Sequence, residues 1–271
     1  MTTNKETRIE SDLLGQMEVP MDALYGVQTA RAIENFYISG QLMSSYTNFI
    51  KGMAITKKAA AMANMEVEMI TREQGEAIIW ACDQLLAGRY HNHFPIDMIQ
   101  GGAGTSTNMC ANEVIANLAL ERMGYKRGEY QYCSPNDVVN ASQSTNDAYP
   151  CAIHMAMCLE HLEFYPRLER MIESLDAKSK EFAHVIKMGR TQLQDAVPMT
   201  LGQTFGGFAA SLRGELANLR SAADEFLTVN MGATAIGTGI CSKPGYSDAC
   251  IEALGKITEI EIGRASCRER V

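Results

Sequence analysis

Three stretches of the sequence combine glycines with closely spaced hydroxyl and amide side chains, which are groups that can bind a small anion. The stretches are "GGAGTSTNMCANE" at residues 101–113, "NASQSTNDAYP" at 140–150 and "GRTQLQDAVP" at 189–198. Polar groups this dense beside apolar helical segments must find partners in the protein, or they are reserved for a ligand. The three stretches together favour a carboxylate-sized site that is lined by neutral donors.

The first two stretches each lead into a predicted helix. Glycines before Thr105 and Ser106 allow close backbone approach, and the free N–H groups of a helix N-terminus attract anions. The first stretch lacks the Lys-Ser/Thr ending of a Walker A loop and the GxGxxG pattern of a dinucleotide site. An ordinary N-cap explains it equally well. Ser144, Thr145 and Asn146 of the second stretch, taken alone, are better explained as a capping cluster.

The segments that must position these clusters have the apolar periodicity of helices. Apolar residues recur three or four positions apart, and glycines at 88 and 124 are suited to end two of the helices. Pro166 is expected to kink a third. The predicted helices cover residues 47–70, 72–88, 106–123, 146–187 and 200–230.

The last two predicted helices carry apolar stripes over their whole length, which is typical of a bundle of long helices. Helices this long usually need partners, so we expect an oligomer. The fold is predicted to be mainly α, with an N-terminal helical domain at 1–145 and an incomplete long-helix bundle at 146–260. The stripes comprise Leu159, Leu162, Leu168, Ile172, Leu175, Phe182 and Ile186, and then Leu201, Phe205, Phe208, Leu212, Leu216, Leu219, Ala223 and Phe226.

The composition disfavours several classes of partner. A formal net charge of -8 over 271 residues argues against binding to nucleic acid or to an anionic membrane. No signal peptide and no membrane-spanning apolar run is expected. The eight cysteines form no CxxC pair and indicate small core residues in a reducing cytosol. His91 and His93 are interpreted as a solvated turn, and no metal site is expected.

The last residues of the sequence are treated separately. "EIGRASCRERV" at 261–271 back-translates into one frame of a widely used sequencing adapter. The sequence therefore predicts that this tail is not native and that the source gene was interrupted at about Ile260. An ordinary basic C-terminus is the alternative, and we assign the tail no function.

The three polar stretches resemble the fumarase/aspartase superfamily. So do "RIESDLLGQMEVPMDALYGVQTARAIENF" near the N-terminus and "MGATAIGTGI" at 231–240, and the resemblance covers essentially residues 7–260. Fumarases typically carry His where this chain has Gln192, so the sequence is more similar to the aspartate ammonia-lyase branch. Class II fumarase is the alternative enzyme, and the motifs of argininosuccinate and adenylosuccinate lyases fit less well. A non-catalytic helical scaffold is the alternative of a different class, since the superfamily includes a lens-protein relative.

The resemblance implies a reaction and a set of substrate-binding residues. The reaction is reversible elimination of ammonia from L-aspartate to give fumarate, through a dianionic aci-carboxylate that donors must stabilise. Thr105, Ser144 and Thr145 match the family positions that grip this carboxylate. Asn146 and the pair Thr191 and Gln192 match positions near the amino group and the other carboxylate. The elimination requires no cofactor. Some family members respond to a divalent metal, but no ligand set for one is visible in this sequence.

The resemblance also identifies what this chain lacks. The family's base is a serine on a Gly-Ser-Ser loop followed by Met-Pro-x-Lys-x-Asn-Pro, and nothing between residues 200 and 271 resembles it. The family builds each site from three subunits of a cytoplasmic homotetramer. No catalytic base is therefore assigned, and the 271-residue chain is expected to be inactive by itself. Cys110 and Cys241 replace asparagines of the family pattern near the expected site walls.

Overall fold

The computed structural model describes residues 6–265, and helices dominate it as the sequence predicts. The chain divides into two compact units. The first unit comprises the residues up to Met157 together with those from Leu227 onward, and the second comprises Cys158–Phe226. The sequence placed a domain boundary between residues 145 and 146. In the structure, the units divide inside one long helix, and the residues after 226 belong to the first unit.

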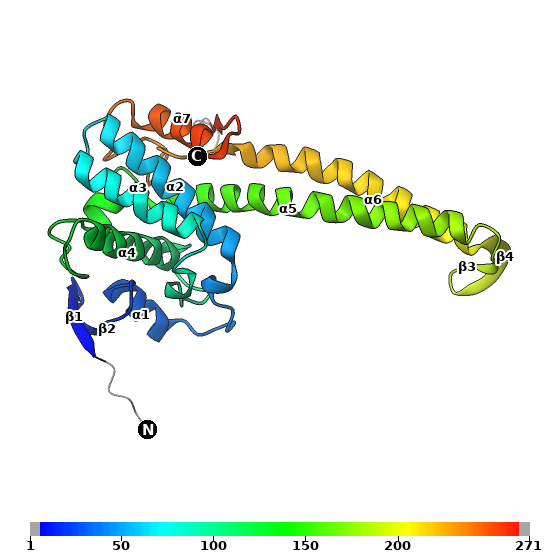
Figure 1. Ribbon diagram of the computed structural model, residues 1–271, viewed down its shortest axis with the longest axis horizontal. Helices are drawn as coiled ribbons and strands as arrows, with labels where there is room; N and C mark the ends of the chain where they lie inside the picture. Colours follow the sequence, from blue (N-terminus) through cyan, green and yellow to red (C-terminus); the bar gives the residue numbers. More distant parts are fainter. Residues whose placement is uncertain (1–5, 266–271) are drawn as a thin grey trace, which may run out of the picture. The chain divides into compact units, whose positions relative to one another are not determined.

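The first unit is built around a buried helix, α4, which packs against α3 and α1 (Figure 1). Every residue of α4 from Thr107 to Leu120 is buried, so this helix has no solvent face. Helix α2 packs against both α3 and α7. The helices of this unit are α1 (Val27–Asn35), α2 (Thr47–Glu66), α3 (Arg72–Leu86), α4 (Thr105–Arg122), the start of α5 (Thr145–Glu181) and α7 (Tyr246–Thr258), with short turns η1 (Met43–Ser45), η2 (His91–His93) and η3 (Pro135–Val139).

Small residues let these helices approach closely. Gly52, which interrupts the apolar pattern of α2, does not break the helix, because a side chain there would collide with the Ala152 carbonyl of α5. Helix α3 begins with a capping box in which Thr71 and Gln74 satisfy each other's backbone N–H groups. The core of the unit thus combines close helix contacts with large buried side chains such as Met53, Phe94 and Ile115.

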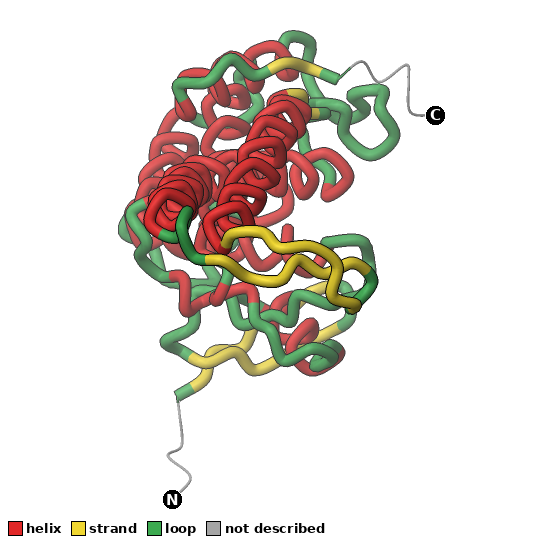
Figure 2. Tube along the Cα trace, turned by 90° about the vertical axis from the view of Figure 1, so that its right-hand side faces the viewer, coloured by secondary structure: helices red, strands yellow, loops and turns green. Residues whose placement is uncertain are grey.

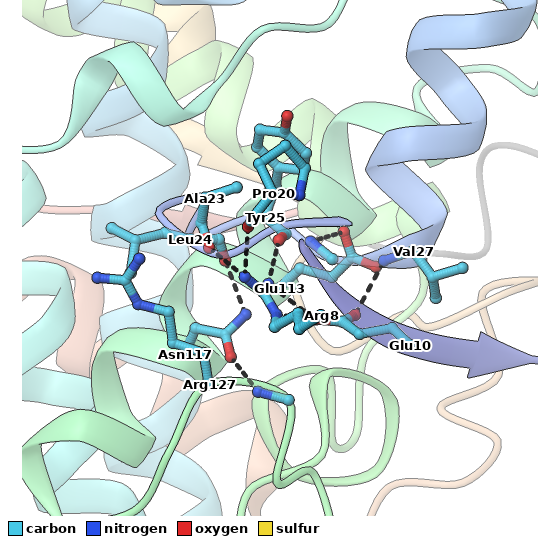
Figure 3. Close-up of polar contacts among 12 residues, drawn as sticks. Arg8, Glu10, Pro20, Ala23, Leu24, Tyr25, Val27, Glu113, Asn117 and Arg127 are labelled. Atoms are coloured by element: carbon cyan, nitrogen blue, oxygen red, sulfur yellow. Dashed lines mark hydrogen bonds and ion pairs between the residues drawn. The ribbon is translucent and has the colours of Figure 1, made fainter. Parts of the chain in front are cut away.

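An antiparallel hairpin precedes α1 and is fixed to α4 by a buried polar network (Figure 3). The hairpin consists of β1 (Thr7–Asp12) and β2 (Gly15–Pro20). Arg8 forms an ion pair with Glu10 at 2.8 Å and donates to the carbonyls of Ala23 (2.8 Å) and Tyr25 (2.7 Å). Glu113 of α4 accepts N–H groups from the start of α1, where a carboxylate also complements the helix dipole. The last residue of the first polar stretch therefore has a structural task.

The second unit contains the remainder of α5, a hairpin and α6 (Leu201–Asp224). The hairpin pairs β3 (Ile186–Thr191) with β4 (Gln194–Thr200), and Thr200 then caps α6 through a capping box with Gln203. The predicted stripes meet in a small core whose members are Leu168, Ile172, Ala209 and Leu216, flanked by Tyr165, Leu175, Leu212 and Leu219.

Several predicted helix ends are wrong, and the hairpins are missed. Helix α5 ends at Glu181 rather than at 187, α6 ends at Asp224 rather than at 230, and α2 ends at Glu66. Helix α5 continues unbroken through Pro166. After α6 the chain forms η4 (Glu225–Leu227) and β5 (Thr228–Val229), which pairs in parallel with β6 (Gly263–Arg264). Figure 2 shows these strand pairs in yellow among the helices.

No helix within residues 6–265 has both the length and the apolar composition needed to cross a bilayer. None of the seven described cysteines is in a disulfide, and five of them are buried, as expected for core thiols. Cys267 and the other residues of the predicted tail from 266 onward lie outside the described residues.

Candidate anion-binding site

The start of α4 lies against the start of α5 because Gly104 occupies the contact. Gly104 caps α4 with a φ of +91°, and a Cβ there would lie 2.6 Å from the Tyr149 ring. Only glycine meets both conditions without strain. Thr105, the first residue of α4, is exposed, and its hydroxyl donates to the Gly102 carbonyl at 2.6 Å. The Thr105 hydroxyl is therefore already hydrogen-bonded within its own loop, and its side chain must rotate before it can donate to a ligand.

The start of α5 is capped as the alternative interpretation proposed. The Ser144 hydroxyl accepts from the Asn146 N–H at 3.2 Å, and the Asp147 carboxylate accepts from the Ser144 N–H at 2.8 Å. Capping leaves the hydroxyl proton of Ser144 without an acceptor among the described residues. A cap and a ligand donor are thus compatible roles for this side chain.

Asp147 and Asn146 also fasten the loop that follows β5. Buried Asp147 accepts from the N–H groups of Gly232 (3.2 Å) and Thr234 (2.8 Å), and burial raises its pKa. The amide nitrogen of Asn146 donates to the Ala235 carbonyl at 2.8 Å. This is the "MGATAIGTGI" segment, so two family motifs meet here. The Asn146 side chain is held by this loop, and its oxygen and its second N–H remain for a ligand.

Asn108 connects the two helix starts. Its amide nitrogen donates to Thr145 Oγ1 at 3.1 Å and to Asn140 Oδ1 at 3.1 Å. Asn112, one turn further along α4, donates to the same Asn140 oxygen at 3.2 Å. Thr145 is half-buried at the edge of this amide cluster. The structure therefore joins the first and second polar stretches, which the sequence could only place on separate helices.

Lys57 of α2 lies beneath this cluster, and the sequence analysis did not identify it. The side chain is fully buried, and Nζ donates to Asn140 Oδ1 at 2.9 Å and Gln143 Oε1 at 2.8 Å. Burial lowers the pKa of Lys57 to about 7, although the carboxylate of Asp147 opposes that shift. Helical spacing does not single it out, because its neighbour Lys58 is also three or four residues from buried Ala54 and Ala61.

Thr191 and Gln192 belong to the second unit, at the tip of the β3–β4 hairpin. Both side chains are exposed. Gln192 and Leu193 form the two-residue turn with φ values of +47° and +68°, a conformation that normally takes Asn-Gly. The structure therefore presents these two predicted site residues on an exposed turn of the second unit, whereas the other four predicted site residues belong to the first unit.

The structure also places the two cysteines and two histidines that the sequence singled out. The thiol of Cys110 donates to the His93 carbonyl, and burial raises its pKa. Cys241 is exposed at a φ of +68°. His91 and His93 are half-buried and not merely solvated: His93 Nδ1 accepts from the Leu24 N–H, and His91 Nε2 contacts the Leu85 carbonyl. Within residues 6–265 no group of three His, Cys, Asp or Glu side chains is placed to hold a metal ion.

Comparison with known proteins agrees with the motifs. A family model described as Lyase matches residues 15–267. Curated relatives include aspartate ammonia-lyase from Pseudomonas canavaninivorans, 53% identical over 95% of this chain, and aspartate ammonia-lyase from Escherichia coli strain K12, 51% identical over 93%. The matches cover 55% and 53% of those two proteins, so this chain spans about half their length.

Solved structures give the same result. A crystal structure described as fumarate lyase:delta crystallin from Brucella melitensis bound to cobalt has a TM-score of 0.91 and 48% identity, covering 96% of this chain and 56% of that one. A class II fumarase from Schistosoma mansoni has a TM-score of 0.85 and 34% identity, covering 94% and 53%. The chain belongs to this lyase family, the fumarase/aspartase superfamily.

Proposed function

We propose that the whole protein is an aspartate ammonia-lyase, which reversibly eliminates ammonia from L-aspartate to give fumarate. The observation that carries this proposal is the junction of α4 and α5, where Asn108 joins the two polar stretches. The Thr145 oxygen accepts from Asn108 and the Ser144 oxygen accepts from the Asn146 N–H, so both hydroxyls keep a proton to donate. Neutral donors beside two helix N-termini suit a carboxylate. The relatives named aspartate ammonia-lyase, at 51–53% identity, support the choice of substrate.

The proposed reaction explains why neutral donors are needed. A base removes a proton from the carbon next to a carboxylate, which becomes a dianionic aci-carboxylate. The C–N bond then breaks, ammonia leaves and the double bond of fumarate forms. Preoriented hydroxyl dipoles stabilise the charge where it develops. We propose that Thr105, Ser144 and Thr145 serve this carboxylate, and that Asn146, Thr191 and Gln192 serve the other end of the substrate.

We propose that the active protein is a cytoplasmic homotetramer and that the elimination needs no cofactor. The absence of disulfides among the described residues supports a reducing compartment. The resemblance to a family that builds each site from three subunits supports a site assembled from several copies. Turnover that persists after dialysis against a chelator would support elimination without a metal.

The test is to sequence the source gene past the codon for Ile260 and assay its complete product. We expect fumarate from L-aspartate and none from malate. Fumarate from malate alone would favour the class II fumarase alternative. Neither reaction, with no stabilisation by aspartate or fumarate, would favour the non-catalytic scaffold. The 271-residue chain is expected to give no turnover, because it lacks the serine loop, and robust turnover by it would contradict the assignment of the base.

A further inference from the structure

Lys57 helps to fix the orientation of the amides around it, together with backbone carbonyls: Asn140 Nδ2 donates to the Gln143 carbonyl at 3.3 Å, and Gln143 Nε2 donates to the Val139 carbonyl at 2.9 Å. An ammonium group can only donate hydrogen bonds, so Asn140 and Gln143 must both point their oxygens at Nζ, at 2.9 and 2.8 Å. The Asn140 oxygen also accepts hydrogen bonds from the amide nitrogens of Asn108 and Asn112. If the Asn140 amide were reversed, its nitrogen would face three other donors.

The effect of this orientation reaches Thr145. The amide nitrogen of Asn108 has two hydrogens, and they go to Asn140 Oδ1 and Thr145 Oγ1. Because Thr145 Oγ1 accepts a hydrogen bond from the protein, its own proton is directed elsewhere. No described residue accepts that proton. A reversed Asn108 amide would instead present its oxygen and take the Thr145 proton, which would remove a ligand donor.

The direction of the network also shows in the other ends of the two amides. The buried side-chain oxygens of Asn108 and Asn112 have no protein donor among the described residues, because the two amide nitrogens are turned toward Asn140. Three donors, from Lys57, Asn108 and Asn112, thus converge on one acceptor, the Asn140 oxygen.

We propose that Lys57 is a positioning residue: through Asn140 and Asn108 it sets the direction of the hydrogen bonds so that the Thr145 hydroxyl presents its proton to the carboxylate of the substrate. This inference rests on the proposed function. Lys57 itself touches neither substrate nor reacting atoms in this role.

The positioning does not depend on the charge of Lys57. A neutral amine keeps two N–H groups, which is the number of amide oxygens that Lys57 serves. The titratable groups that act on Lys57 are Asp147 of α5 and Cys82 of α3. Asp147 accepts three backbone N–H groups, and burial raises the pKa of Cys82. Activity should therefore not fall merely because pH passes through 7.

The test uses the complete gene product with Lys57→Met, which removes both N–H donors but keeps the length of the side chain. Two probes separate the roles: succinate carries two carboxylates, and the nitronate form of 3-nitropropionate resembles the aci-carboxylate. We expect kcat/KM for L-aspartate and the affinity for 3-nitropropionate each to fall roughly 100-fold. The loss of activity should be in kcat. The affinity for succinate should change by less than about threefold.

The matched control is Lys58→Met, one position along the same helix. Lys58 pairs with Asp83 at 2.7 Å rather than with the amide cluster, so this variant should keep the wild-type kcat and both affinities. If Lys57→Met does not fold, Asn108→Ala provides the second variant. It removes the donor to Thr145 while keeping Lys57, and the same selective loss of 3-nitropropionate binding is expected.

Two results would overturn the inference. One is an equal loss of succinate and 3-nitropropionate binding, which indicates that Lys57 only supports the fold. The other is unchanged kcat and affinities in a folded Lys57→Met variant. Either result counts against the inference only when the wild-type protein turns over aspartate. A wild-type protein without that activity, and without affinity for either probe, would instead overturn the proposed function and the inference with it.

Discussion

Lys57 makes the stability of the first unit depend on pH. Burial lowers the pKa of Lys57 in the folded state to about 7, below its unfolded value of 10.5. A base whose folded pKa is depressed is destabilising while it is protonated, and that cost diminishes as pH rises from about 7 toward 10. We therefore expect the stability of Lys57→Met relative to wild type to be higher at pH 6.5 than at pH 8.5.

The expected change follows from linkage. Between these pH values the free energy of unfolding of wild type should rise relative to that of Lys57→Met by up to about 1.4 kcal/mol per pH unit. Urea denaturation at several pH values measures it, and the thiol titration of the unfolded chain is common to both proteins and cancels in the difference. Lys58→Met should follow the pH dependence of wild type, because its partner Asp83 is outside the amide cluster. A constant difference between wild type and Lys57→Met would contradict the assigned pKa.

Gly104 is the second residue whose identity the fold requires. We expect Gly104→Ala to destabilise the protein by about 2–4 kcal/mol, because a Cβ would meet both a left-handed backbone and the Tyr149 ring. Gly124, near the other end of α4, has a φ of +89° and open space around it. Gly124→Ala should cost only about 1 kcal/mol. Thermal or urea unfolding compares the two, and equal losses would mean that the contact with Tyr149 is unimportant.

For single residues, the sequence identifies which side chains carry hydroxyl and amide groups but not the direction of the hydrogen bonds that they form. The spacing of Ser144, Thr145 and Asn146 before an apolar helix indicated a polar helix start, and the structure has one there. That Asn146 is committed to the Ala235 carbonyl depends on a contact across 89 positions, which periodicity cannot show. Lys57 was overlooked because a charged residue is expected at the surface unless the surrounding helices are known to enclose it.

At the scale of elements, the β3–β4 hairpin carries a strained turn. Leu193 has a φ of +68°, and its side chain is 92% exposed, so it gains little from packing. Leu193→Gly should stabilise the hairpin by about 1 kcal/mol, since glycine adopts this conformation without steric cost. Urea denaturation or hydrogen exchange of the β3–β4 amides measures the gain.

The control for that substitution is another exposed hairpin leucine. Leu14 lies in the turn between β1 and β2 and is 80% exposed, but it is not among the residues with positive φ. Leu14→Gly should therefore give no gain and should lose about 0.5–1 kcal/mol through the greater freedom of the unfolded chain. Equal effects of the two substitutions would show that the conformation of Leu193 is not strained.

The element predictions succeeded where apolar periodicity was long and failed where it ended. Helix α4 matches its predicted range to within one residue at each end. The stripe of α5 appeared to include Phe182 and Ile186, yet the backbone leaves the helix at Glu181, and Ile186 is 78% exposed in a strand. An apolar residue at the right spacing cannot distinguish the end of a helix from the start of a short exposed strand.

At the scale of the whole molecule, the second unit leaves much of its predicted apolar stripes uncovered. Leu162 of α5 and Phe208 of α6 belong to those stripes, yet they are 63% and 56% exposed. The buried apolar core of this unit is limited to Leu168, Ile172, Ala209 and Leu216. Exposed apolar side chains at helical spacing on long helices are typical of an interface between copies of a chain.

We therefore expect the 271-residue chain to self-associate through the second unit. Leu162→Ser combined with Phe208→Ser should raise the dissociation constant at least roughly tenfold, because each apolar side chain contributes about 1.5–3 kcal/mol when it is covered. Sedimentation velocity over a concentration series measures the change. Ile9→Ser in the first unit, where Ile9 is 59% exposed on β1, is the matched control and should associate like wild type. A chain that stays monomeric at all concentrations, or a double variant that associates as tightly as wild type, would show that other surfaces make the oligomer.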